Sequence, residues 1–187
     1  MLYRKDLDRH YKKIWPSSLI LDVEETKEIQ SKYQGNHNLS DVFQIVTHLD
    51  RLGGIDKLVV RNEEKELYGI SERIRNSEFA HFRQLTLRPT ELEREFLAYH
   101  SHNLIRANYF AYGAKHSNNQ EWAYLYIVNM DKLMDWAIGK GSVLNRLDWA
   151  HSPKFIEKTN DPFWAWDFDV MPKDLFLMEY NHIDIVL

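Results

Sequence analysis

Charged residues that could act on a phosphate gather in one short stretch of the chain, "GISERIR" at residues 69–75, and Asp56 lies shortly before it. Glu72 supplies a carboxylate in this stretch, and Arg73 follows it directly. Hydrolysis of a phosphodiester needs carboxylates that hold Mg²⁺ and a cation near the scissile phosphate. Asp56, Glu72 and Arg73 are candidate residues of these types.

The spacing of these residues limits which side chains can act together. On an extended strand, residues two apart share one face and lie about 6.6 Å apart along the chain. Ser71 and Arg73 therefore share a face, and Glu72 lies on the other face with Ile74. If Ser71 and Arg73 form the pair, a hydroxyl replaces the second carboxylate. If Glu72 is the acid, its neighbour Ile74 supplies no cation.

Two arrangements would complete the site. A β-bulge near Gly69 would turn Glu72 toward Asp56, because bulges redirect side chains beside active sites. Alternatively, a helix near the N-terminus would supply the missing carboxylate. Its candidate residues are Glu24, Glu25 and Glu28. The sequence leaves both arrangements open.

Further arginines lie close by in the chain. Arg75, Arg83 and Arg88 would form a basic patch if their strands are neighbours, and we expect them to bind the phosphates of a nucleic-acid backbone. The alternative is a solvated surface on which each ion pair contributes little to stability. The acidic residues available for such pairs are Glu63, Glu64, Glu66 and Glu78.

The elements that must position these residues follow from the pattern of apolar residues. Helices are predicted near residues 3–14, 23–33 and 40–52, ending at Pro16, Gly35 and Gly53. Residues 55–60 and 66–74 read as strands joined by a polar turn of hairpin length, which predicts antiparallel neighbours. Residues 83–89 are expected to add a third strand to this meander, and residues 90–104 to form a helix.

The second half of the chain is more aromatic. Residues 107–116 and 121–129 predict a second hairpin, residues 130–141 a short helix, and residues 161–187 further strands. One face of the hairpin is expected in the core. The other face either fills the core or a dimer interface, or is exposed to a nucleic-acid base or a protein partner. The aromatic residues concerned are Tyr109, Phe110, Tyr112, Trp122, Tyr124 and Tyr126.

Composition sets the broad class. A chain of 187 residues, 44% of them hydrophobic, is long enough for one sizeable core. We therefore expect a single domain over residues 1–187, with a helical part (1–52), a central core (53–138) and a strand-rich part (139–187). The predicted class is α+β, with a central mixed or mostly antiparallel sheet flanked by helices.

Several kinds of protein are excluded or disfavoured by composition. The chain has no cysteine, which excludes disulfides and thiolate metal sites. The net charge of -4 neither indicates nor excludes nucleic acid. No apolar stretch has the length of a signal peptide or a membrane span, so we expect a cytoplasmic protein without a membrane partner.

The order helix, "GGIDKLVV", turn and "YGISERIR" resembles the PD-(D/E)xK nuclease superfamily over roughly residues 40–138. The resemblance implies a restriction-endonuclease-like fold of phage or bacterial type that requires Mg²⁺ and acts on or binds nucleic acid. It also implies a catalytic site of Asp56, Glu72 and Arg73, in which Asp56 and Glu72 bind the metal. The motif departs from the family pattern, since arginine stands where the family has lysine. The alternative is a protein-interaction module on an eroded nuclease scaffold, such as an inhibitor or adaptor in a conflict between phage and host.

Overall fold

The computed structural model describes residues 2–25, 54–61, 66–100, 106–116, 121–139, 148–157 and 162–181. Within these ranges the helices are α1 (Leu2–Ile14), α4 (Pro89–His100) and α5 (Met130–Ala137). The strands are β1 (Leu19–Asp22), β2 (Lys57–Arg61), β3 (Glu66–Arg75), β4 (Gln84–Leu87), β5 (Tyr109–Lys115), β6 (Trp122–Asn129), β7 (Lys154–Ile156), β8 (Phe163–Asp167) and β9 (Phe176–Asn181). Short 3-10 helices span Ser77–Phe79, Phe168–Val170 and Lys173–Leu175.

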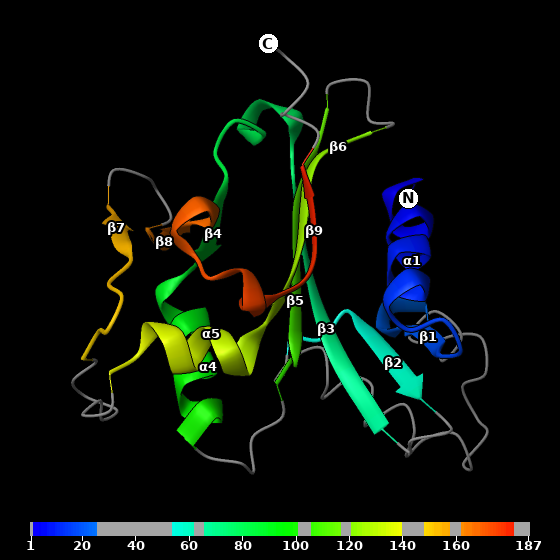
Figure 1. Ribbon diagram of the computed structural model, residues 1–187, viewed down its shortest axis with the longest axis horizontal. Helices are drawn as coiled ribbons and strands as arrows, with labels where there is room; N and C mark the ends of the chain where they lie inside the picture. The colour runs from blue at the N-terminus through cyan, green and yellow to red at the C-terminus, as the bar shows by residue number, and fades with distance from the viewer. Residues whose placement is uncertain are drawn as a thin grey trace, which may run out of the picture. The chain divides into compact units, whose positions relative to one another are not determined.

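The strands form two sheets, which confirms the predicted α+β class (Figure 1). The larger sheet has six strands in the order β1-β2-β3-β5-β6-β9 and is mixed, with one parallel pair. The smaller sheet has three strands in the order β4-β8-β7. The chain also divides into two compact units, Met1–Arg73 with Ile105–Ala111, and Ile74–Leu104 with Tyr112–Leu187. The prediction of one domain over residues 1–187 stays a prediction.

The first unit contains the hairpin that the sequence predicts. β2 and β3 pair antiparallel in a regular register from Lys57 opposite Ile70 to Arg61 opposite Glu66. β1, which the sequence patterns did not indicate, pairs antiparallel with β2 and sets Asp22 opposite Lys57. Its four residues are too few to show a clear alternation, which is why it escapes sequence-based prediction.

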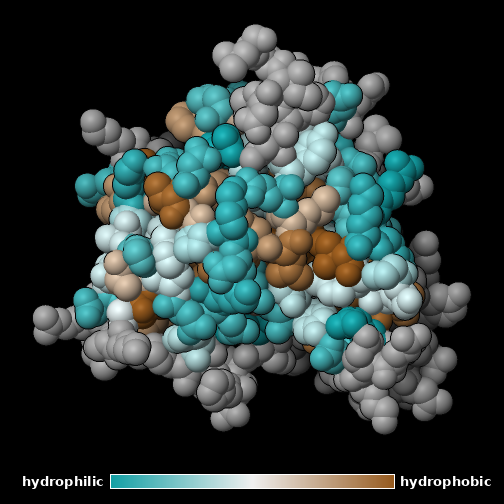
Figure 2. Space-filling model, in the orientation of Figure 1, coloured by the Kyte–Doolittle hydropathy of each residue, from teal (hydrophilic) through white to brown (hydrophobic). Residues whose placement is uncertain are grey.

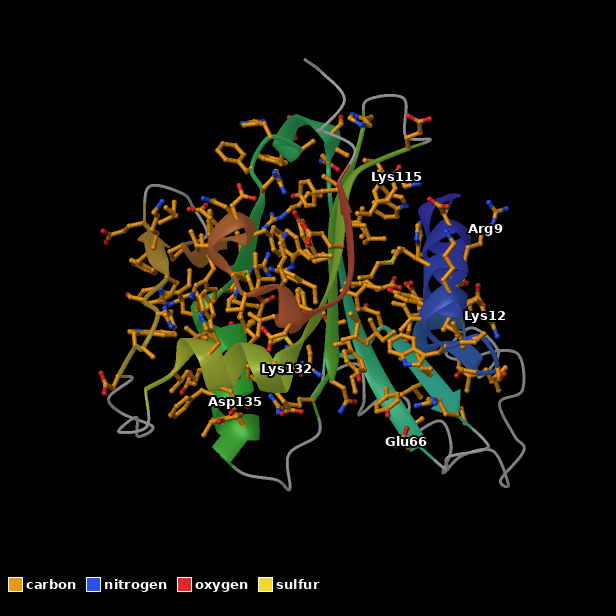
Figure 3. All side chains as sticks on the ribbon, in the orientation of Figure 1. Arg9, Lys12, Glu66, Lys115, Lys132 and Asp135 are labelled. Atoms are coloured by element: carbon orange, nitrogen blue, oxygen red, sulfur yellow. The ribbon has the colours of Figure 1, made fainter. Side chains whose placement is uncertain are left out.

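Helix α1 packs on the strands of the first unit through one side only. Its buried face contains Leu7 and Tyr11, while Arg9 and Lys12 lie on the exposed side (Figure 3). Trp15, directly after the helix, stacks on Tyr68 of β3 with ring centroids 6.1 Å apart. The predicted amphipathic helix is confirmed, and its buried face determines what lies beside β3.

In the second unit, β4 does not extend the predicted meander. β4 pairs antiparallel with β8 in the small sheet, from Gln84 opposite Asp167 to Leu87 opposite Trp164. The prediction that residues 83–89 add a third strand to the β2-β3 meander is therefore wrong. The partner strand lies about 80 residues away along the chain, and no local pattern in the sequence encodes such a pairing.

The aromatic residues of β5 and β6 fill the core instead of forming an exposed face. Five of the six predicted residues are buried, and Tyr109 is half-buried. For the described residues, the alternative in which both faces of this hairpin fill the core is therefore confirmed. The strands are buried on both faces, and strands of this kind lose the alternation of apolar and polar residues.

Helices α4 and α5 lie beside each other in the second unit (Figure 1). The hydroxyl of Tyr99 in α4 donates a hydrogen bond to Asp135 of α5, which is labelled in Figure 3. Asn129 caps α5 by accepting a hydrogen bond from the backbone N–H of Lys132 at 3.0 Å. Both helices agree with the sequence-based prediction where residues 90–104 and 130–141 are described.

The predicted helix over residues 40–52 and most of the one over 23–33 fall outside the described residues. Among the residues that are described, no helix is long and apolar enough to cross a membrane.

Candidate functional site

The first unit holds a buried lysine between two aspartates. Nζ of Lys57 lies 2.8 Å from Oδ2 of Asp22 and 3.2 Å from Oδ1 of Asp8, a residue of α1. The side chains of Lys57 and Asp22 are only 3% and 6% exposed. The other oxygen of Asp22 accepts the backbone N–H groups of Glu24 and Glu25 at 2.9 and 3.0 Å. The ion pair is therefore fixed by β1, β2 and α1 together.

Asp56 binds the backbone of Glu72, the residue whose carboxyl group interacts with Lys57. The backbone N–H of Glu72 donates a hydrogen bond to Oδ2 of Asp56 at 2.6 Å, and the backbone N–H of Asp56 donates to the carbonyl of Ile70 at 2.8 Å. Gly54 has a φ of 57°, a conformation that favours glycine, where the chain enters this segment. The structure thus joins the Asp56 carboxylate to the backbone of Glu72, and the charge of Asp56 contributes to the raised pKa of the Glu72 carboxyl group.

The side chain of Glu72 faces α1. Its Oε1 accepts a hydrogen bond from the hydroxyl of Tyr11 at 2.8 Å. Burial raises the pKa of Glu72 to about 7, and the negative charges of Asp56 and Asp8 add to the increase. The Tyr11 hydrogen bond and the charge of Lys57 oppose it. Glu72 therefore exchanges a proton near neutral pH.

Lys57 keeps its charge in this environment. Burial alone lowers the pKa of an ammonium group, but the hydrogen bond to Asp22 and the charges of Glu72, Asp22 and Asp8 raise the pKa of Lys57 above its usual value. The cluster defined by Asp8, Asp22, Asp56, Lys57 and Glu72, called the acidic cluster below, combines four carboxyl groups with one ammonium group. This surplus of negative charge favours the binding of a further cation or of protons.

Arg73 does not join the acidic cluster. Its guanidinium lies over the ring of Phe110, 5.8 Å from the centroid, whereas Glu72 faces Tyr11. Adjacent residues on a regular strand point to opposite faces. The register of β2 and β3 shows no shift near Gly69, so the predicted bulge is not present in this pairing. The assignment of Arg73 as the catalytic cation stays a prediction that this geometry does not favour.

The other predicted arginines belong to the second unit. Nε of Arg75 donates to the hydroxyl of Tyr112 at 2.8 Å. Arg83 donates to the hydroxyl of Tyr126 at 2.7 Å and lies 3.2 Å from Asp169. The backbone N–H of exposed Arg88 donates to Glu91 at the start of α4. Their role in phosphate binding stays a prediction, and Arg75 alone lines a pocket, described below.

Sequence reasoning missed Lys57, Asp22 and Tyr11. A usable signal was present for Lys57, because it interrupts the apolar strand "IDKLVV" on the same face as Val59. A charge at a buried position requires a partner, but Asp22 lies 35 residues earlier in the chain. Among the alternative carboxylates, Glu24 and Glu25 are exposed, and Glu28 lies outside the described residues.

The raised pKa of Glu72 predicts a specific pH dependence of stability. Between pH 4.5 and 7 the unfolded chain ionises this carboxyl while the folded protein keeps it protonated, so the free energy of unfolding falls as pH rises. In Glu72→Gln this contribution disappears. The measured quantity is the free energy of unfolding of Glu72→Gln minus that of the wild type, obtained by urea denaturation. We expect this difference to increase by roughly 2 to 3 kcal/mol between pH 4.5 and pH 7.5. An unchanged difference over this range would contradict the prediction.

Comparisons with protein-family models, curated proteins and solved structures find no match to this chain. Within the described ranges, no group of three or more histidine, aspartate or glutamate side chains is arranged to hold a metal ion. A metal ion bound by Asp56 and Glu72 would therefore need water or substrate as further ligands.

Proposed function

We propose that this protein is a metal-dependent phosphodiesterase of restriction-endonuclease-like type that acts on nucleic acid. The observation that carries the proposal is the hydrogen bond from the Glu72 backbone to Asp56, together with the electrostatic interaction of the Glu72 carboxyl group with both Asp56 and Lys57. Two carboxylates and a cation are the groups that phosphodiester hydrolysis requires. Lys57 takes the place that the sequence pattern gives to Arg73.

The carboxyl oxygens of Asp56 and Glu72 are ligands of the kind that Mg²⁺ prefers. Mg²⁺ prefers oxygen ligands and is commonly bound by one or two carboxylates together with substrate phosphates. The pKa of Glu72 is raised in part by Asp56 and Asp8, which indicates negative charge that a divalent cation would neutralise. When bound, Mg²⁺ would stabilise the negative charge that develops on the phosphoryl oxygens.

The residues of the chain set the conditions for such binding. Glu72 must lose its proton before it can serve as a ligand, so metal affinity should rise as pH increases through about 7. Asp56 fixes the backbone of Glu72, and Tyr11 orients its carboxyl group. Lys57, held by Asp22 and Asp8, keeps a positive charge beside Glu72 whether or not the metal is present.

The test is cleavage of DNA and RNA substrates in Mg²⁺ or Mn²⁺ by the full chain. Asp56→Asn removes a ligand charge with little change in shape, and we expect it to lower the rate by on the order of 100-fold or more. The matched control is Asp174→Asn, since Asp174 is an exposed residue of the second unit. Equal rates for Asp56→Asn and the wild type would overturn the assignment of this site.

The alternative function, a protein-interaction module on an eroded nuclease scaffold, is supported by a different observation. The polar groups of the acidic cluster have partners within the protein: Lys57 binds Asp22, Glu72 binds Tyr11, and Asp56 binds the Glu72 backbone. A cluster of this kind also serves simply to attach α1 to the strands. Thermal denaturation in Mn²⁺ separates the two functions. A nuclease is expected to gain stability that Asp56→Asn abolishes, whereas an interaction module gains none.

A further inference from the structure

The second unit contains a pocket that the acidic cluster does not include. It has a volume of about 350 Å³ and lies among residues of β3, β4, β5 and the 3-10 helix Ser77–Phe79. Arg75, Gln84, Thr86 and Tyr112 supply its polar groups. A volume of this size lies within the range of small-molecule sites in proteins.

The charge of Arg75 is not neutralised by the described residues. Its Nε donates to the hydroxyl of Tyr112 at 2.8 Å, its Nη2 donates to the hydroxyl of Thr86, and its guanidinium lies over the Tyr112 ring. Both hydroxyl groups are neutral, and they also hydrogen-bond to each other at 2.8 Å. Among the described residues Arg75 has no carboxylate partner, and no acidic side chain lines the pocket. The guanidinium has five N–H donors and therefore retains donors for an anion.

Gln84 also lines the pocket, and its side-chain amide is held in one orientation. Nε2 of Gln84 donates to Oδ1 of Asp167 at 2.6 Å, across the β4-β8 pair. This bond holds the amide and leaves the carbonyl oxygen of Gln84 without a partner among the described residues. A ligand that satisfies both Arg75 and Gln84 carries an anionic group and an N–H or O–H donor.

The remaining lining consists of aromatic residues and the aliphatic Ile156, and it is partly exposed. In the view of Figure 2, hydrophilic residues cover most of the coloured surface, with hydrophobic patches between them. In the pocket, Phe79 and Phe82 are 42% and 52% exposed, and Phe163 lines the same space. Exposed aromatic rings beside a cation favour a planar ring in the ligand, because stacking of a base on an aromatic side chain contributes about 1 to 3 kcal/mol.

We propose that this pocket binds a nucleotide, with the base against the phenylalanine rings, the phosphate on Arg75, and Gln84 accepting a hydrogen bond from the base or sugar. A simple anion would leave the aromatic rings unused, and an apolar ligand would leave Arg75 without an anion. The nucleotide is either a free nucleoside monophosphate or the phosphorylated end of a strand, since both present the same groups. This proposal stands whether or not the acidic cluster cleaves nucleic acid.

The experiment measures binding by the full chain, in EDTA so that no cleavage interferes. The probes are AMP, UMP, inorganic phosphate, benzoate and a short single-stranded oligonucleotide with a 5′-phosphate. We expect the mononucleotides to bind at least about tenfold more tightly than phosphate or benzoate, and Arg75→Gln to weaken this binding about tenfold or more. Tighter binding of the oligonucleotide identifies a strand end as the ligand, and tighter binding of AMP or UMP identifies a free nucleotide.

Two further variants make the test specific. Phe82→Ala, at an exposed position, should weaken nucleotide binding but leave the affinity for inorganic phosphate unchanged. Lys173→Gln removes an exposed cation that pairs with Glu179 and should change neither affinity. Equal binding of nucleotide and phosphate, equal binding of benzoate, or unchanged nucleotide affinity in folded Arg75→Gln would each overturn the proposal.

Discussion

Replacing Lys57 with methionine is expected to lower the free energy of unfolding by about 3 to 5 kcal/mol, because removing one partner of a buried ion pair leaves the other charge uncompensated. The side chains of Lys57 and Asp22 are almost fully buried, and the ammonium group contacts both Asp22 and Asp8. Methionine retains an unbranched side chain of similar length, so loss of packing contributes little. The loss of charge dominates the expected effect.

Urea denaturation at pH 7.5 measures this effect, with Lys13→Met as the matched control. Lys13 is an exposed residue of α1, so the same substitution there should change stability by less than about 0.5 kcal/mol. Adding Asp22→Asn to Lys57→Met should restore part of the lost stability, because asparagine removes the uncompensated charge. Asparagine also keeps a side-chain oxygen that can accept the backbone N–H groups of Glu24 and Glu25. Similar losses for the two lysine variants would contradict a structural role for the ion pair.

Phe168→Ala is expected to lower the free energy of unfolding by about 3 to 5 kcal/mol, through a cavity in the second unit. Phe168 is 1% exposed and stacks on Tyr126, with ring centroids 3.9 Å apart and an angle of 13° between the planes. It also contacts Tyr112, Tyr124 and Phe176. Alanine would remove the ring that contacts all four of these aromatic side chains.

The control for this variant is Val170→Ala, two residues further along in the same 3-10 helix. Val170 is an exposed residue, so the substitution should change stability by less than about 0.5 kcal/mol. The dependence of the unfolding free energy on urea concentration should stay the same in Phe168→Ala if only the native packing is lost. A loss below about 1 kcal/mol would show that the surrounding rings close the cavity.

Local patterns in the sequence predict much of the secondary structure. The alternation in residues 66–74 and the polar turn before it predict the β2-β3 hairpin, and the spacing of Leu7 and Tyr11 predicts α1. The same alternation separates Glu72 from Arg73, and the structure places these residues toward Tyr11 and Phe110 respectively. These features depend on residues close together in the chain, so the sequence alone defines them.

Contacts between distant segments are not encoded in this way. Lys57 meets Asp22 across 35 residues, Glu72 meets Tyr11 across 61, and Gln84 meets Asp167 across 83. Each of these contacts forms only when a helix or strand from elsewhere in the chain packs against its partner. For this reason the sequence alone could identify Asp56 and Glu72 as candidate residues, but not the residues of distant segments that contact Glu72. The folded chain determined that Lys57, and not Arg73, lies near the Glu72 carboxyl group. Glu72 and Arg73 are adjacent on β3 and point to opposite faces, and α1 covers the face of Glu72.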